Sequence, residues 1–210
     1  MARSGKKYLV LGTGVGKAIA YALLKSSESA HVTIADLKFS IADKIRNEIL
    51  KSLGRDADCK AISFKASTKG AIKIFKHYNV VISALPAKFN PMLAEVAFMV
   101  GPNFCDLGEV VSVTEEMLHL SDKYPNSSVS VVPDCGLMPG MGIIMARKLI
   151  ESFQKPESVT IYVGGLPQKP RPPVYHQSMF YLGGLKSICY EKAPILKDGV
   201  IIYREPYYGY

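Results

Sequence analysis

The sequence predicts an α/β protein in which a doubly wound, Rossmann-type parallel sheet is followed by a short α+β unit. Over the first two-thirds of the 210 residues, short apolar runs alternate with helical patterns. Such alternation produces a parallel sheet with helices on both faces. After Pro139 the alternation stops, and one helical pattern leads into strand-like segments joined by glycines. We therefore expect one domain over residues 1–138 and a second, partial domain over residues 139–210.

Six strands are expected in the first domain, because six short apolar runs are separated by turn residues and helical patterns. They cover residues 8–11 (YLVL), 32–35 (VTIA), 61–64 (AISF), 80–83 (VVIS), 103–105 (NFC) and 129–132 (VSVV). Helices are expected between them, one ending at Lys25 and the others over residues 41–53, 71–76, 91–100 and 115–123. A ligand of such a sheet binds beyond the carboxyl ends of the strands, so functional residues should follow each strand directly.

The second unit should contain a helix and an antiparallel meander. The helix is expected over residues 141–153, and the strand-like segments cover residues 159–163, 178–182, 191–196 and 200–204. This unit has only about 70 residues, which is small for a domain. We therefore expect it to be incomplete, or to need a partner that covers its sheet edges.

The charge of the chain does not indicate a nucleic-acid partner. The formal net charge is +8, but the lysines and arginines are spread along the sequence with no dense basic run and no recognisable nucleic-acid module. A diffuse positive charge affects solubility and attracts anionic cofactors, but it does not identify a partner. We expect no nucleic-acid partner.

The cysteines and the apolar runs exclude two other classes. The four cysteines lie far apart without a C-x-x-C pair, which argues against a zinc site and against a disulfide scaffold, and we expect no metal. No apolar run approaches the ~18 residues of a membrane span, and the N-terminus lacks the core of a signal peptide. We expect a cytoplasmic protein without a membrane partner.

A glycine-rich turn follows the first expected strand. Residues 8–20 read YLVLGTGVGKAIA, so the turn contains Gly12, Thr13, Gly14, Val15 and Gly16. In a dinucleotide-binding turn, G-x-G-x-x-G, the first glycine permits the tight turn, the second admits the pyrophosphate and the third allows close packing of helix on strand. Here the third glycine comes one residue early. The pattern favours a shortened dinucleotide turn, although an ordinary strand-to-helix turn can also be rich in glycine.

A Walker A loop is excluded, and an acidic residue further along supports the dinucleotide interpretation. Leu11 stands where a Walker A loop needs glycine, and Ala18 replaces the Ser or Thr that holds magnesium. Asp36 lies 20 residues beyond Gly16, at the end of the second expected strand, where a carboxylate accepts hydrogen bonds from the adenosine ribose. A carboxylate there repels a 2′-phosphate, so NAD is favoured over NADP. NADP remains possible because Lys38 is close. The alternative is that Asp36 serves only as a turn residue or a helix cap.

Several later segments resemble a known family. These are VVISALPAKFN, FCDLGEV, VVPDCGLMPGM, IYVGGLPQKPRPP and EKAPILKDGVI. They are similar to the saccharopine dehydrogenase family, most of all to its lysine 6-dehydrogenase branch. The resemblance implies an NAD(P)-dependent oxidoreductase with a Rossmann domain, here residues 1–138, and a substrate and dimerisation domain, here residues 139–210. Relatives continue beyond the position of Tyr210, so we expect the chain to be truncated at its C-terminus.

The resemblance also implies a substrate and partners. The family moves hydride between nicotinamide and a carbon that bears nitrogen, so the expected substrate is a small amino acid amine. A homodimer, or a partner that supplies the missing C-terminal segment, is expected. One alternative is an inactive nucleotide-binding paralogue that acts as a subunit or sensor. A short-chain or epimerase-type reductase is disfavoured, because no Tyr-x-x-x-Lys pair stands at a strand end of the Rossmann unit.

Further candidate cofactor residues stand at the strand ends within the family-like segments. They are Ser83, Ala84, Leu85 and Pro86 after the fourth strand, Asp106 and Leu107 after the fifth, and Pro139 where the two units join. Small residues and a proline leave room for the cofactor and stiffen the backbone. A plain strand exit, a helix cap at Asp106 and a rigid hinge at Pro139 are the structural alternatives.

The sequence offers four candidates for the catalytic base, among them Lys88, which follows the corner at residues 84–86. Oxidation of an amine requires removal of a proton from the ammonium group, because hydride leaves readily only from a neutral amine. Asp106 and Asp134 are carboxylates at strand ends, and His176 has the most suitable unperturbed pKa. A lone histidine before a strand is also compatible with a structural role.

Overall fold

The computed structural model describes residues 5–108, 110–173, 175 and 189–206 of the chain. Two compact units are distinguished by their internal contacts, residues 1–157 and residues 158–210. The helix over residues 141–150 is therefore grouped with the first unit, whereas the expected functional boundary at residue 138 stays a prediction.

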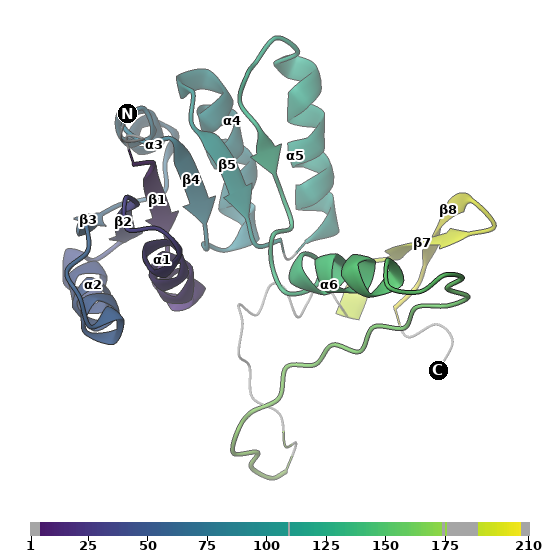
Figure 1. The fold of residues 1–210 in the computed structure, drawn as a ribbon. Coiled ribbons are helices and arrows are strands. Elements are labelled where there is room, and N and C mark those ends of the chain that lie inside the picture. The colour runs from purple at the N-terminus through teal and green to yellow at the C-terminus, as the bar shows by residue number, and fades with distance from the viewer. Residues whose placement is uncertain (1–4, 109, 174, 176–188, 207–210) are drawn as a thin grey trace. The chain divides into compact units, whose positions relative to one another are not determined.

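A six-stranded parallel sheet forms the centre of the first unit (Figure 1). Its spatial order is β3-β2-β1-β4-β5-β6, and every neighbouring pair is parallel. This is the doubly wound order with a reversal between β1 and β4. The expected α/β fold class is confirmed. The strands are β1 (Lys7–Leu11), β2 (His31–Asp36), β3 (Cys59–Ser63), β4 (Val80–Ser83), β5 (Asn103–Asp106) and β6 (Val131–Val132).

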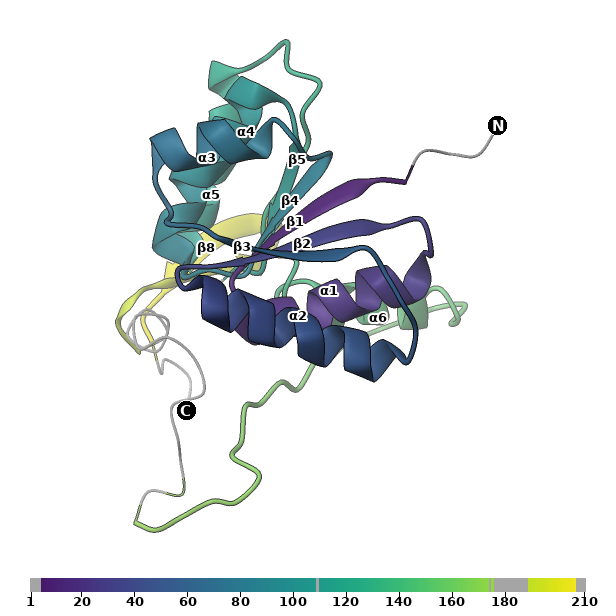
Figure 2. The ribbon, with the colours of Figure 1, turned by 90° about the vertical axis from the view of Figure 1, so that its left-hand side faces the viewer.

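Helices cover both faces of this sheet. Figure 2 shows α1 and α2 against one face and α3, α4 and α5 against the other. The helices are α1 (Gly14–Ser26), α2 (Phe39–Leu53), α3 (Thr68–Phe75), α4 (Asn90–Val100), α5 (Val111–Lys123) and α6 (Met141–Ile150), with a short 3₁₀ helix η1 (Ala87–Phe89) before α4. Within the described part of the chain, no helix combines the length and the apolar character needed to cross a membrane.

The core consists of two apolar layers, one on each face of the sheet. Leu9 and Leu11 of β1 pack into the layer beneath α3, α4 and α5, where Phe75, Leu93 and Met117 are also buried. The side chain between them, Val10, belongs to the other layer, beneath α1 and α2. All three β1 residues are fully buried, as expected for a central strand of a parallel sheet, in which both faces are covered.

Some element ends differ from expectation. The helix α5 begins at Val111 rather than at residue 115, since the run VVSV resembles a strand but Val113 packs on the core beside buried Met117. The strand β6 has two residues rather than four, and α6 ends at Ile150 rather than at residue 153. Helix ends and edge strands depend on tertiary neighbours more than on local pattern.

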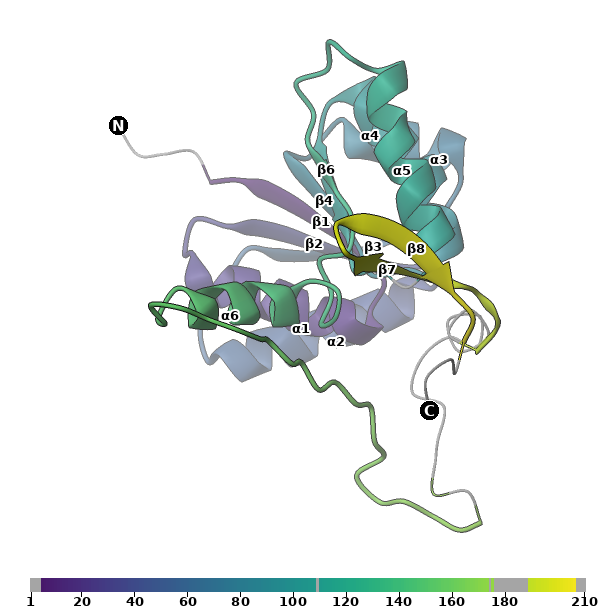
Figure 3. The ribbon, with the colours of Figure 1, turned by 90° about the vertical axis from the view of Figure 1, so that its right-hand side faces the viewer.

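The second unit contains an antiparallel hairpin, drawn in yellow in Figure 3. The strands β7 (Ala193–Lys197) and β8 (Val200–Arg204) confirm the last two expected strands, with β7 shifted by one or two residues. Asp198 and Gly199 connect them with φ values of 52° and 79°, as a two-residue hairpin turn requires. The strand expected over residues 159–163 is not formed, because none of the described strands pairs with it. The segment 178–182 lies outside the described residues.

Candidate functional site

The candidate site lies at the carboxyl ends of the central strands, where the order of the sheet reverses between β1 and β4. Leu11 at the end of β1 pairs with Ala35 on one side and with Ser83 on the other, and Ser83 pairs with Asp106. Four strand ends are therefore in one row. The glycine turn, Asp36, residues 83–86 and residues 106–107 all project from this row, which is the position of ligands in doubly wound sheets.

The shortened turn retains three distinct glycine environments. Gly12 has a φ of 92°, and a Cβ there would lie 2.6 Å from the Ala84 carbonyl oxygen, so only glycine fits without displacement of the backbone. A Cβ on buried Gly16 would lie 3.1 Å from Cγ1 of Val10, so the absence of a side chain allows α1 to approach β1 closely. A Cβ on Gly14 would meet nothing within 4 Å. Gly14 is exposed and leaves the backbone accessible.

The start of α1 has the properties of an anion-binding site. Thr13 occupies the N-cap position, but its side chain makes no capping hydrogen bond, and no acidic residue stands in the first turn. Gly14 and Val15, the first two residues of the helix, are both exposed. Uncapped amides and the positive end of the helix dipole favour a negative ligand here.

Asp36 is tied directly to this turn. Its Oδ2 accepts a hydrogen bond of 2.7 Å from the Thr13 hydroxyl, and its Oδ1 accepts one of 3.1 Å from the backbone N–H of Lys38. The carboxylate is part-buried. The structure therefore brings together the two features on which the dinucleotide interpretation depends, the turn and the acid 20 residues beyond Gly16.

The end of β4 provides the opposite wall of the turn. The carbonyl of Ala84 and the side chain of Leu85 are the groups nearest to Gly12 across the turn, and Pro86 precedes the 3₁₀ helix η1. Ser83 is fully buried and donates a 2.8 Å hydrogen bond to Oδ1 of Asn90. This internal hydrogen bond connects the end of β4 to the first residue of α4.

Asp106 lies at the end of β5 and is only 2% exposed. Its Oδ1 accepts hydrogen bonds from the backbone N–H groups of Gly108, at 2.6 Å, and Asp134, at 3.3 Å. Burial raises the pKa of Asp106; the two backbone N–H groups oppose that shift, and the nearby charge of Asp134 adds to it. The residue holds the loops after β5 and β6 together.

Asp134 follows β6 and faces the same loops. Its backbone φ is 62°, a left-handed conformation that is uncommon outside glycine, and its Oδ1 accepts a 3.0 Å hydrogen bond from the Thr114 hydroxyl. A Cβ on Gly108 would overlap with the same Oδ1. The glycine of the FCDLGEV segment therefore makes room for the Asp134 carboxylate.

The carbonyl groups of Leu107 and Pro139 both lie beside Gly136, in a compact loop. Gly136 is bridged to Gly140, and the N–H of Met141 donates a 2.9 Å hydrogen bond to the Gly136 carbonyl. A Cβ on Gly136 would overlap with the Leu107 carbonyl and lie 3.3 Å from that of Pro139. The two predicted residues thus border the same loop, adjacent to Asp134.

One predicted residue cannot be placed, and two further residues orient predicted ones. His176 lies outside the described residues. Asn90 and Thr114, which orient Ser83 and Asp134, were not foreseen, since each contact is made between different elements. The only local signal for Asn90 was its place directly before Pro91, because such a pair is typical of the start of a helix. Among the described residues, no group of three or more His, Cys, Asp or Glu side chains could hold a metal ion.

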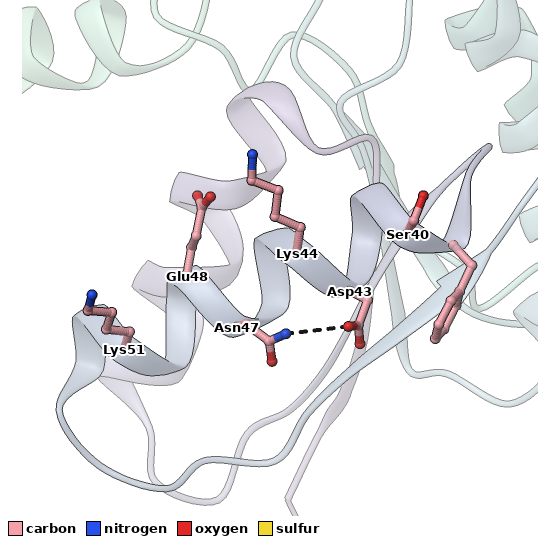
Figure 4. A pocket seen from close by; sticks show the side chains of 7 residues that line it. Ser40, Asp43, Lys44, Asn47, Glu48 and Lys51 are labelled. Carbon is pink, nitrogen blue, oxygen red and sulfur yellow. Dashed lines mark hydrogen bonds between the residues drawn. The ribbon is translucent and has the colours of Figure 1, made fainter.

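A hollow lies elsewhere and contains none of the candidate residues. It has a volume of about 590 Å³ and is lined by one face of α2, from Phe39 to Lys51 (Figure 4). Asn47 donates a 3.3 Å hydrogen bond to Asp43 along this face. Since one helix alone lines the hollow, it does not enclose a ligand, and the strand ends remain the candidate site.

Residues 8–132, more than half of the chain, match the family model described as the saccharopine dehydrogenase NADP binding domain. The chain belongs to the saccharopine dehydrogenase family. This confirms the resemblance seen in the sequence, and the matched range contains the glycine turn, Asp36 and the ends of β4 and β5.

Individual relatives are similar over parts of their length. The chain is 28% identical over 142 residues to an alpha-aminoadipic semialdehyde synthase from Arabidopsis thaliana, which covers 65% of this chain and 12% of that protein. Apo saccharopine dehydrogenase (L-Glu forming) from Saccharomyces cerevisiae has a TM-score of 0.62 and 21% identity, over 96% of this chain and 44% of its own. A short-chain type dehydrogenase/reductase from Mycobacterium ulcerans has a TM-score of 0.50 and 14% identity, over 63% and 67% of the two chains. The chain thus spans less than half of the first two proteins, and the two structures share its fold.

Proposed function

We propose that this chain binds a nicotinamide dinucleotide at the carboxyl ends of β1 and β4 and contributes to oxidation of the C–N bond of an amino acid amine, as in lysine 6-dehydrogenase. One observation carries the proposal: within a chain of this family, the exposed Gly14, the uncapped start of α1 and the Asp36 carboxylate all lie at one end of the sheet. A dinucleotide requires all three, for its pyrophosphate and for its ribose.

NAD is the proposed cofactor, although the family model is described as NADP binding. The Asp36 carboxylate is fixed by two hydrogen bonds at the end of β2. A fixed negative charge there accepts ribose hydroxyls and repels a 2′-phosphate. Lys38, whose side chain is exposed, weakens this preference without reversing it.

The chemistry divides between the cofactor and the protein. When bound, the nicotinamide supplies the hydride acceptor. The protein must orient the amine and remove a proton from its ammonium form. Asp134 is the proposed base, because its carboxylate is incompletely buried and is positioned by Thr114 at the loop that also contains Pro139.

Asp106 is proposed to act through Asp134 rather than on the substrate. It is 2% exposed, and its Oδ1 holds the backbone N–H of Asp134. His176 remains a proposed alternative base from the sequence. Loss of turnover in Asp134→Asn, together with turnover retained in His176→Gln, would support Asp134.

A second candidate function is a nucleotide-binding subunit or sensor without turnover. The observation that favours it is the burial of Asp106, which keeps one of the two strand-end carboxylates from direct contact with a substrate. Both candidates predict binding of the cofactor, and only the first predicts formation of reduced nicotinamide.

The experiment that tests the proposal measures binding and turnover separately. Calorimetry with NAD and NADP is followed by detection of reduced nicotinamide with lysine and with saccharopine. Asp134→Asn should abolish turnover and keep NAD affinity, whereas Asp122→Asn, at an exposed position on α5, should change neither. Tight NAD binding without turnover over a panel of amines would leave the subunit or sensor. If neither cofactor binds, both candidates are rejected.

A further inference from the structure

Thr13 is placed where a helix-capping residue stands, yet its hydroxyl does not cap the helix. Threonine at an N-cap usually accepts a hydrogen bond from an amide of the first turn. Here the side chain makes no such bond. Instead, the hydroxyl donates a 2.7 Å hydrogen bond to Oδ2 of Asp36, at the end of the neighbouring strand β2. This one orientation has two effects: the first-turn amides stay free of a side chain, and the carboxylate gains a fixed donor.

The carboxylate of Asp36 keeps capacity for a ligand while it is held. A carboxylate can accept about four hydrogen bonds, two at each oxygen. Thr13 uses one position on Oδ2, and the backbone N–H of Lys38 uses one on Oδ1. One acceptor position therefore remains on each oxygen, and two adjacent ribose hydroxyls need that number.

We propose that Thr13 is the residue that sets cofactor specificity, by holding the Asp36 carboxylate in the orientation that accepts both adenosine ribose hydroxyls and opposes a 2′-phosphate. This inference rests on the proposed dinucleotide function. The hydroxyl of Thr13 acts through Asp36 and is a positioning group. Without it, the carboxylate keeps only the hydrogen bond to Lys38 and can turn away from the ribose.

The turn itself does not depend on this hydroxyl. The N–H of Gly12 donates to the Ala35 carbonyl at 2.8 Å, and the N–H of Ala84 donates to the Leu11 carbonyl at 2.8 Å. These backbone bonds connect the turn to β2 and β4 independently of any side chain. Removal of the hydroxyl should therefore leave the fold unchanged and alter the orientation of Asp36. A purely structural role for Thr13 would instead predict a loss of stability.

The test compares Thr13→Val with Thr13→Ser. Valine keeps the shape of threonine and removes the donor, whereas serine keeps the donor. By calorimetry, Thr13→Val should weaken NAD binding up to about tenfold, because binding must then order the Asp36 carboxylate, and should change NADP binding by less than about threefold. The ratio of the two affinities should fall in Thr13→Val and return toward the wild-type value in Thr13→Ser. Thr13→Ala provides a second variant should valine disturb the turn.

A double-mutant cycle decides whether Thr13 acts through Asp36. In an Asp36→Ala background, Thr13→Val should have no further effect on NAD affinity. The inference is overturned if Thr13→Val lowers NAD and NADP affinity equally, leaves both unchanged, or has its full effect in the Asp36→Ala background. Wild-type protein that binds neither cofactor would reject the proposed function itself, which separates the two failures.

Discussion

Replacement of Gly14 by alanine should raise stability and lower cofactor affinity at the same time. Gly14 is the first residue of α1, and a Cβ built there meets no heavy atom within 4 Å. Alanine restricts the unfolded chain and suits a helix better than glycine, so the free energy of unfolding should rise by about 0.5 kcal/mol. The same open space is where a pyrophosphate must approach the backbone.

The loss of affinity follows from that geometry. A methyl group at Gly14 separates the phosphate oxygens from the first-turn amides by more than the length of a hydrogen bond. Loss of even one charge-assisted hydrogen bond corresponds to about tenfold or more in affinity. NAD binding by calorimetry and unfolding by urea should therefore change in opposite directions in Gly14→Ala.

Gly12→Ala is the matched control, because it should behave differently. A Cβ at Gly12 would lie 2.6 Å from the Ala84 carbonyl, in a backbone conformation with φ of 92°. The strain should cost about 2 kcal/mol or more in the free energy of unfolding. If Gly14→Ala binds NAD as tightly as the wild type, residues 12–16 are an ordinary strand-to-helix turn, and the reasoning is refuted.

Three further predictions concern Asp36, Asn90 and Asp106. Asp36→Ala should weaken NAD binding more than about tenfold, and an unchanged affinity would remove Asp36 from the adenosine pocket. Asn90→Ala should lower the free energy of unfolding by about 1–3 kcal/mol, because it leaves the buried Ser83 hydroxyl without its partner; a loss of NAD affinity at unchanged stability would contradict this anchoring role. Burial raises the pKa of Asp106, so its ionisation destabilises the fold as the pH rises above about 4, the ordinary range of an aspartate. Asp106→Asn should therefore stabilise the protein more at neutral pH than at about pH 4 in urea unfolding, and an equal effect at both would contradict the pKa shift.

The fold and the position of the candidate site could be predicted because both follow from local pattern. A central strand such as β1 is buried on both faces, so its sequence is continuously apolar, and the residues after it must lie at the edge of the sheet. The end of β2 could be placed in the same way, which located Asp36 correctly. The segment 159–163 shows the limit of such reasoning: its apolar run resembles a strand, but a strand forms only where another pairs with it.

The roles of individual side chains could not be predicted, since they depend on contacts between distant residues. Thr13 and Asp36 are 23 residues apart, and Thr114 and Asp134 are 20 apart. Nothing in the local sequence indicates that the Thr13 hydroxyl turns from its helix to Asp36. The environment of Asp106 has the same origin, because the N–H of Asp134, in the loop after β6, donates to its Oδ1.

The shortened turn is compatible with a working dinucleotide site because the helix start has shifted together with the glycine. Gly16, Ala20 and Leu24 are the buried residues of α1 and are spaced by four, so the face of the helix that meets β1 begins at the early glycine. Lys17, at the position of the usual third glycine, consequently points away from the strand and pairs with Glu48 of α2 at 2.6 Å. The loop is one residue shorter than G-x-G-x-x-G, and the three glycine environments that a dinucleotide turn needs are all present. The shortened turn therefore gives no reason to expect loss of the proposed cofactor binding.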